Sequence, residues 1–161
     1  MDIVYRTLEK EDIPKVITMF SELAKEAAEV SFAEILSEEE IVEWIEDEDI
    51  YTYAAFEGEL LLGMLRAKRG KGVQNHSVLL TVAVKRSYRG NRIAKDIINY
   101  GLLQLKAQGV SLARAYIYSD NRASINTILS CDFTFSGCVY QHHYSEEQQK
   151  FIDDLIFHKI L

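Results

Sequence analysis

Basic residues gather where an apolar run gives way to a helical pattern. Residues 79–84 read LLTVAV, which predicts a buried strand, and the turn KRSYRGNR follows. Apolar residues then recur at three- and four-residue spacing up to Gly109, which predicts an amphipathic helix. The start of a helix presents unpaired N–H groups and a positive dipole end, and residues 85–95 contain no acid. With Gly90 allowing close backbone approach, the stretch predicts an anion site that suits a pyrophosphate.

The alternative reading of this stretch is an ordinary strand-to-helix turn with a solvated basic face. Two common phosphate-binding loops are excluded, because the chain contains neither G-x-x-x-x-G-K-[ST] nor G-x-G-x-x-G. The stretch instead resembles motif A of the GNAT superfamily of acyl-CoA-dependent N-acyltransferases, in which a strand leads into R/Q-x-x-G-x-G/A. Residues 89–94 (RGNRIA) fill this frame, with Arg92 where the family usually has glycine.

The resemblance implies a site for acetyl-CoA as cosubstrate, with no metal. Backbone amides of the turn would hold the pyrophosphate of coenzyme A, and the pantetheine arm would pair with Val82 and Val84. A backbone N–H near Val82 would polarise the thioester carbonyl, the role of an oxyanion hole. The implied cofactor-binding residues are Val82, Ala83, Val84, Arg89, Gly90, Asn91, Arg92, Ile93, Ala94 and Lys95, joined by Asn121 and Ser124.

Residues 119–133 (SDNRASINTILSCDF) supply the last two of these residues and predict a helix capped by Asp120 or Asn121. The residues expected to face inward are Ile125, Ile128 and Leu129. The stretch resembles motif B of the same superfamily, N-x-x-A-I-x-x-Y-x-x-x-G-F. Its departures are Ser124 for alanine, Asp132 for glycine and Ile128 for the tyrosine that in many members protonates the departing thiolate.

Groups for proton transfer are less evident in the sequence. A usual base position on the fourth strand falls on Val78, which does not titrate, and His76 is two residues further out. Another family position, five residues before Asn121, is Tyr116. Tyrosine is a poor base but a serviceable acid near neutral pH, so Tyr116 is the predicted catalytic residue, with strand packing as its alternative role. The weaker candidates, expected before or within the last long loop, are His142, His143 and Tyr144.

Residues 22–49 contain twelve acids and one base, Lys25. Since the first two helices of the superfamily often roof the acceptor site, this run predicts a preference for a cationic amine. The alternative is a solvated helix face.

Length and composition predict one domain over residues 1–161. The net charge of −7 argues against a nucleic-acid surface, and no apolar run approaches the roughly 20 residues that span a membrane. Cys131 and Cys138 lack metal-ligand spacing and suit buried thiols in a reducing cytoplasm. A homodimer is compatible with the sequence, which does not set the oligomeric state.

The order of predicted elements resembles the superfamily along the whole chain. A strand at residues 3–6 precedes a helix capped by Asp12, with apolar residues up to Ala27, and Ser37 begins a second helix. A hairpin around Gly58 and strands at 75–84, 113–118, 134–140 and 154–161 follow. The expected fold class is α/β (α+β): a mixed, mostly antiparallel sheet of six to seven strands, splayed between strands four and five, with about four helices.

The implied function is an N-acetyltransferase that moves an acetyl group directly from acetyl-CoA to a primary amine of a small molecule or protein. The alternative is a non-catalytic acyl-CoA-binding or interaction domain that has lost the general-acid tyrosine. A third reading, acylation of charged tRNA, is disfavoured by the acidic balance.

Overall fold

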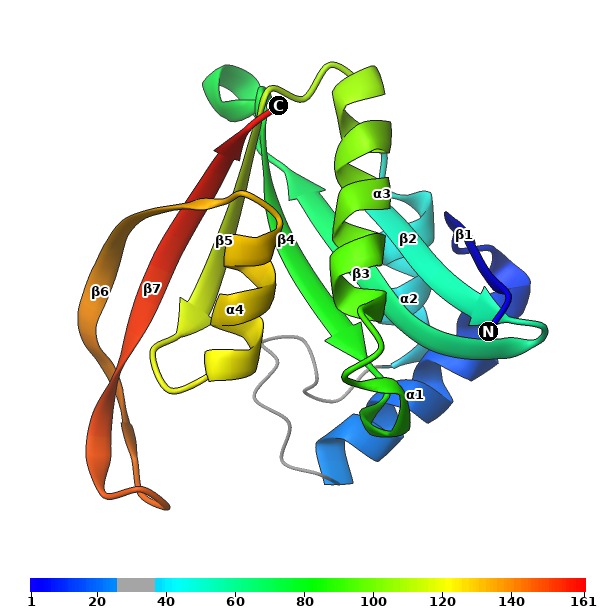
Figure 1. Cartoon of the computed structure of the whole chain (residues 1–161). Helices are drawn as coiled ribbons and strands as arrows, with labels where there is room; N and C mark the ends of the chain where they lie inside the picture. Colours follow the sequence, from blue (N-terminus) through cyan, green and yellow to red (C-terminus); the bar gives the residue numbers. More distant parts are fainter. Residues whose placement is uncertain (26–36) are drawn as a thin grey trace.

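The computed structural model describes residues 1–25 and 37–161 and places them around one sheet with helices on both faces (Figure 1). In the described chain the strand order is β1-β2-β3-β4-β5-β7-β6, and only the β4–β5 pairing is parallel. The elements are β1 (Ile3–Thr7), α1 (Ile13–Lys25), α2 (Glu38–Glu46), β2 (Ile50–Glu57), β3 (Leu60–Arg69), β4 (Ser77–Val84), α3 (Ile93–Ala107), β5 (Leu112–Tyr118), α4 (Arg122–Ser130), β6 (Thr134–Ser145) and β7 (Lys150–Ile160). The predicted fold class is confirmed.

Each face of the sheet carries its own apolar core. One core lies beneath α3 and α4 and includes the predicted stripe of α3, namely Ile93, Ile97, Ile98, Leu102 and Leu105. The other lies beneath α1 and α2 and includes Phe20, Ile41 and Trp44. Because side chains alternate along a strand, β4 sends Val78 and Leu80 to the first core and Ala83 to the second. The side chains of β4 therefore contribute to both cores.

The sheet opens between its two parallel strands, as expected. β4 and β5 pair only through residues 77–80 and 112–115. Beyond Leu80 and Ala115 the two strands diverge, and Figure 1 shows them running apart toward the basic turn and α4. The gap between residues 81–84 and 116–118 is the feature around which the candidate site is built.

Several predicted boundaries are wrong. Asn75 and His76 precede β4, because a short 3-10 helix, Gly72–Gln74, turns the chain first. β6 continues to Ser145, so His142, His143 and Tyr144 lie in a strand and not in a loop. The long hairpin persists because Tyr144 packs edge-on against Phe151 and the N–H of Gln141 at the bulge is bound by the Asp153 carboxylate.

Three side-chain predictions are corrected or fall outside the description. Leu129 was expected to face inward but is 46% exposed, and Cys138 is exposed while Cys131 is buried. The prediction for Ala27 lies outside the described residues. Ser37 caps α2 as predicted, accepting a hydrogen bond from the N–H of Glu40.

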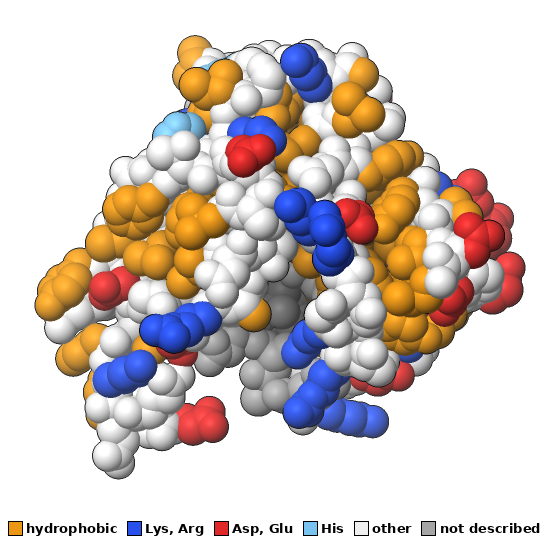
Figure 2. Space-filling view, in the orientation of Figure 1, with side chains coloured by type: hydrophobic (Ala, Val, Ile, Leu, Met, Phe, Trp, Pro, Cys, Tyr) orange, Lys and Arg blue, Asp and Glu red, His pale blue; other side chains and the backbone are white. Residues whose placement is uncertain are grey.

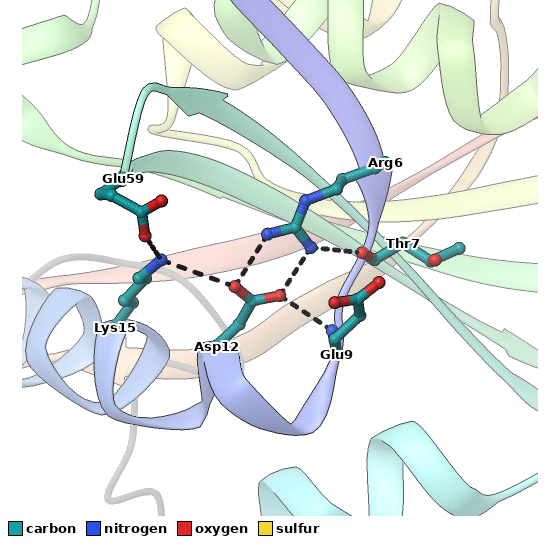
Figure 3. Close-up of polar contacts among 6 residues, drawn as sticks. All are labelled: Arg6, Thr7, Glu9, Asp12, Lys15 and Glu59. Carbon is teal, nitrogen blue, oxygen red and sulfur yellow. Dashed lines mark hydrogen bonds and ion pairs between the residues drawn. The ribbon is translucent and has the colours of Figure 1, made fainter.

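Asp12 anchors the first helix, though not as its cap. It ends a 3-10 turn, Lys10–Asp12. Its carboxylate accepts hydrogen bonds from Nη1 and Nη2 of Arg6, at 2.7 and 2.9 Å (Figure 3). The N–H of Glu9 donates to the same carboxylate at 2.8 Å. Burial opposes its ionisation, but these hydrogen bonds and the charges of Arg6 and Lys15 hold the pKa of Asp12 below its usual 3.8. This network fixes the start of α1 against β1.

We predict that Asp12→Asn lowers the free energy of unfolding by about 1.5–3 kcal/mol at neutral pH, because it breaks a buried charged hydrogen-bond pair. A carboxyl with a lowered folded-state pKa stabilises the fold above its unfolded pKa and loses that contribution as pH falls through the folded value. The difference from wild type should therefore shrink below about pH 4, as measured by denaturant titration.

The control is Glu59→Gln. Glu59 pairs with Lys15 at 2.7 Å but is 95% exposed, so its loss should cost less than about 1 kcal/mol. Equal costs for the two variants, or a difference that does not shrink as the pH falls below about 4, would contradict the assigned role of Asp12.

Candidate active site

The β4 edge that faces the gap presents unpaired backbone donors. The N–H of Lys85 donates to the carbonyl of Leu62 in β3 at 2.8 Å. Because successive N–H groups along a strand point to opposite edges, those of Val82 and Val84 point away from β3, into the gap. No described strand pairs with them there. The gap thus offers donors for a ligand with amide or carbonyl oxygens.

The basic turn brings the start of α3 to the end of β4. A 3-10 turn, Arg86–Tyr88, leads into Gly90 with φ +84° and Arg92 with φ +63°, and α3 begins at Ile93. Arg89 Nε donates to the carbonyl of Val84 at 3.2 Å, which ties the turn to the strand. A Cβ on Gly90 would meet no atom within 4 Å, so backbone conformation and not space requires glycine here.

Side chains at the turn leave its backbone accessible. Asn91 donates from Nδ2 to the carbonyl of Tyr88 at 3.2 Å, and Asn91 and Arg92 are exposed. Ile93 is buried, whereas Ala94 and Lys95 are half-buried. Figure 2 shows this face of the molecule hollowed between its two halves, with Lys and Arg side chains on both sides of the hollow. In a chain of net charge −7, this local excess of positive charge favours an anionic ligand.

The comparisons with known proteins bear on this geometry. Residues 17–133 match the model of the Acetyltransferase (GNAT) family. The chain belongs to the GNAT acetyltransferase family. No curated protein matches the sequence at a significant level.

Solved structures share the GNAT fold at low sequence identity. An acetyltransferase of the GNAT family from Streptococcus pneumoniae superposes with a TM-score of 0.88 at 17% identity, covering 99% of this chain and 100% of that one. A ribosomal-protein-alanine N-acetyltransferase from Brucella melitensis gives 0.85 at 20% identity, covering 98% and 99%. A suspected acetyltransferase from Salmonella typhimurium, solved with its cofactor acetyl-CoA, gives 0.86 at 16% identity, covering 99% and 94%.

The second GNAT motif forms α4, and its cap lies on the far side of the gap. Asn121 is the cap: its side-chain oxygen accepts from the N–H of Ser124 at 3.2 Å. Asp132, where the motif has glycine, adopts φ +65°, the left-handed conformation that glycine favours. Ile128 is 4% exposed and belongs to the core beneath α3 and α4. It packs there and offers no proton donor.

Tyr116 and Tyr118 lie where the gap opens, on the sheet face opposite α3 and α4. Ala113 and Ala115 of β5 fill the core beneath α3 and α4, so alternate residues point to the other face. Tyr116 is 50% exposed and pairs with Ile156 of β7. It is accessible to a ligand in the gap, as a proton donor must be.

A second group of titratable side chains lies beside the gap. The sequence singled out His142 and His143 as weaker candidates but missed Asp154. The Tyr118 ring centroid lies 4.7 Å from that of His143, and Tyr118 pairs in register with Asp154. Burial raises the pKa of Asp154 above its usual value, against the opposing charges of His142 and His143. The buried Nδ1 of His143 has no hydrogen-bond partner among the described residues. Asp is depleted in strands, so the paired acids within FIDDLIF were the signal available in the sequence.

Of the other expected polar groups, Glu22 of the acidic run pairs with Lys85 at the end of β4, at 3.5 Å. His76 is exposed outside β4. The α2 acids of the predicted acidic run, Glu38, Glu39, Glu40, Glu43 and Glu46, are exposed, whereas Ile41 and Trp44 of the same helix pack on the sheet. Glu26, Glu29 and Glu34 lie outside the described residues.

The described residues lack a metal-binding cluster and a membrane-spanning helix. No group of three or more His, Cys, Asp or Glu side chains could hold a metal ion. No described helix is long and apolar enough to cross a membrane.

We predict that Arg92→Gly raises the free energy of unfolding by about 1 kcal/mol, because it removes a side chain from a left-handed residue. Asp132→Gly is the matched control: the same conformation, at the end of α4. Thermal unfolding should show both variants above wild type. Calorimetry with coenzyme A should show a several-fold weaker affinity in Arg92→Gly alone, since only that variant removes a cation from the turn. A destabilised Arg92→Gly would refute the strain argument.

Proposed function

We propose that this chain is an acetyl-CoA-dependent N-acetyltransferase that acts on a primary amine by direct transfer. The observation that supports this most is the β4 edge, where the N–H groups of Val82 and Val84 face a gap that no described strand fills. A thioester in that gap meets a donor for its carbonyl oxygen, and a basic turn lies at the strand's end for the pyrophosphate. A structural neighbour from Salmonella typhimurium was solved with acetyl-CoA.

Each residue around the gap has a role in this proposal. Gly90, Asn91 and the backbone through Lys95 hold the pyrophosphate, assisted by the charges of Arg89 and Arg92. Val82 N–H polarises the carbonyl, and Asn121 with Ser124 borders the cofactor on the α4 side. The neutral amine attacks from the opposite face of the sheet, and proximity within one cleft supplies much of the rate.

Proton transfer falls to groups on the amine's side of the gap. The amine loses one proton to water as the amide forms, and the departing thiolate of coenzyme A gains one from Tyr116, the exposed donor where the gap opens. Water then returns a proton to Tyr116. Ile128 is in the core and cannot replace it. Two free thiols, one of them exposed, fit the reducing cytoplasm that we propose as the location.

We predict that Gly90→Val weakens coenzyme A binding by at least about tenfold, which is about 1.4 kcal/mol. The substitution forces a β-branched residue into a left-handed turn whose amides bind the pyrophosphate. Gly58→Val is the matched control, because Gly58 also has a positive φ (+56°), open space at its Cβ and a place in a distant hairpin. Calorimetry should show parental affinity in Gly58→Val. Parental affinity in Gly90→Val would place the pyrophosphate elsewhere.

We predict that Tyr116→Phe lowers kcat by roughly 10²–10⁴-fold, because it removes only the donor hydroxyl. Thiol release from acetyl-CoA across an amine panel measures kcat, and the affinity for coenzyme A should stay unchanged. Tyr140→Phe is the control, since Tyr140 is 74% exposed on the β6 edge strand. An unchanged kcat in Tyr116→Phe would remove Tyr116 from the mechanism.

The alternative is a non-catalytic acyl-CoA-binding domain. It is favoured by one observation, the core position of Ile128 where many members have a catalytic tyrosine. Coenzyme A binding without thiol release on any amine would establish it.

A further inference from the structure

Arg114 is a charged residue on the amine's side of the sheet, immediately before the gap. It pairs in register with Leu79 of β4, one position before the last β4–β5 pair, Leu80 with Ala115. Its strand neighbours Ala113 and Ala115 point into the core beneath α3 and α4, so Arg114 points to the same face as Tyr116. Two residues of strand, about 7 Å, separate the two side chains along β5.

No described carboxylate neutralises this guanidinium. Arg114 is half-buried, and its Nη1 donates to Oγ of the buried Ser77 at 3.3 Å. None of its register neighbours on this face is an acid: they are Leu79 of β4 and His158 of β7, and His158 places Nδ1 2.9 Å from the Ser136 hydroxyl. A guanidinium taken partly out of water normally meets an anion.

The described acids that could have neutralised Arg114 lie elsewhere. Asp154 shares the face but pairs with Tyr118, four residues along β5 from Arg114 and therefore roughly 13 Å away. The acids of α2 are exposed on a helix that packs against the other half of the sheet, and Glu22 pairs with Lys85 at 3.5 Å.

Arg66 and Lys68 of β3 point to this face as well, beside Thr81 and Leu79 of β4. The described charges on the β3, β4 and β5 part of this face are thus positive, and the acid Asp154 lies beyond the mouth of the gap.

We propose that Arg114 binds a carboxylate of the acceptor, so that the acceptors are small primary amines carrying a carboxylate, as amino acids do. This inference rests on the function proposed above and names its substrate class. The planar fork of arginine matches a carboxylate with two parallel hydrogen bonds. The exposed Leu79 and Tyr116 flank the site and suit the apolar side chain of such an acceptor.

The test compares amines that differ only in the carboxylate. Leucine, leucinamide and 3-methylbutylamine share one skeleton and present a carboxylate, a neutral amide and no such group. We expect kcat/KM with acetyl-CoA to be at least tenfold higher for leucine than for either partner. O-phosphoethanolamine against ethanolamine tests a phosphate in place of the carboxylate. A higher preference for the phosphate, or no preference for leucine, would overturn the proposal.

Variants of Arg114 separate charge from geometry. Arg114→Gln should lower the leucine-to-3-methylbutylamine ratio of kcat/KM at least tenfold, and Arg114→Lys should retain part of the ratio because it keeps the charge without the fork. Lys106→Gln removes one charge from the exposed end of α3 and should keep the wild-type ratio. Thermal unfolding checks that each variant is folded. A ratio unchanged in folded Arg114→Gln would overturn the proposal.

Binding without chemistry distinguishes the failure of this proposal from failure of the proposed function. Calorimetry of leucine into the protein saturated with coenzyme A needs no turnover. Binding that is lost in Arg114→Gln, with no thiol release on any amine, supports the carboxylate site and refutes the enzyme. Turnover of amines with no preference for the carboxylate supports the enzyme and refutes the site. If the protein neither turns over any amine nor binds leucine, both proposals are refuted.

Discussion

The separation of β4 from β5 is the constraint on which the rest of the structure depends. A parallel pair that stays together satisfies its backbone groups internally, and such a sheet has no room for an extended ligand. Here pairing stops at Leu80 and Ala115 while both strands continue. Val84 is buried and Val82 half-buried, so their unpaired N–H groups are costly unless a ligand or water occupies the gap. The proposed oxyanion hole and the unpaired edge are therefore the same physical feature.

Backbone strain at the turn follows from the same constraint. To bring the start of α3 to the end of β4, the chain takes two left-handed residues within three positions, Gly90 and Arg92. Glycine accepts this conformation at little cost, but arginine does not. The chain keeps a cation there all the same, at the helix N-terminus where we propose that an anion binds. Arg92 thus lowers stability and adds positive charge to the proposed site, which is a trade-off between stability and function at one position.

The sequence was most informative where residues are read locally. The stripe of α3, the caps Ser37 and Asn121, and the hairpin at Gly58 depend on near neighbours, and each is found as predicted. The errors arose where contacts with another segment determine the structure. β6 runs through His142 because the facing strand β7 pairs with it, and Asp12 turns inward because Arg6 lies opposite. Arg114 and Asp154 escaped notice because only the register of β5 against β4 and β7 brings them to one face.

In the proposed function, the two sides of the gap bind different ligands. On the α3 and α4 side, backbone amides and a basic rim suit a polyanionic acyl donor, whichever acceptor is used. On the other side, recognition rests on side chains, with Arg114 before the gap and the Tyr118, His143 and Asp154 group beyond it. Backbone contacts tolerate substitution, whereas side-chain contacts are changed by single mutations. In the proposed enzyme, acceptor choice can therefore be altered on one face without disturbing the proposed cofactor site on the other, because the strand alternation that separates the two cores also separates the two sets of contacts.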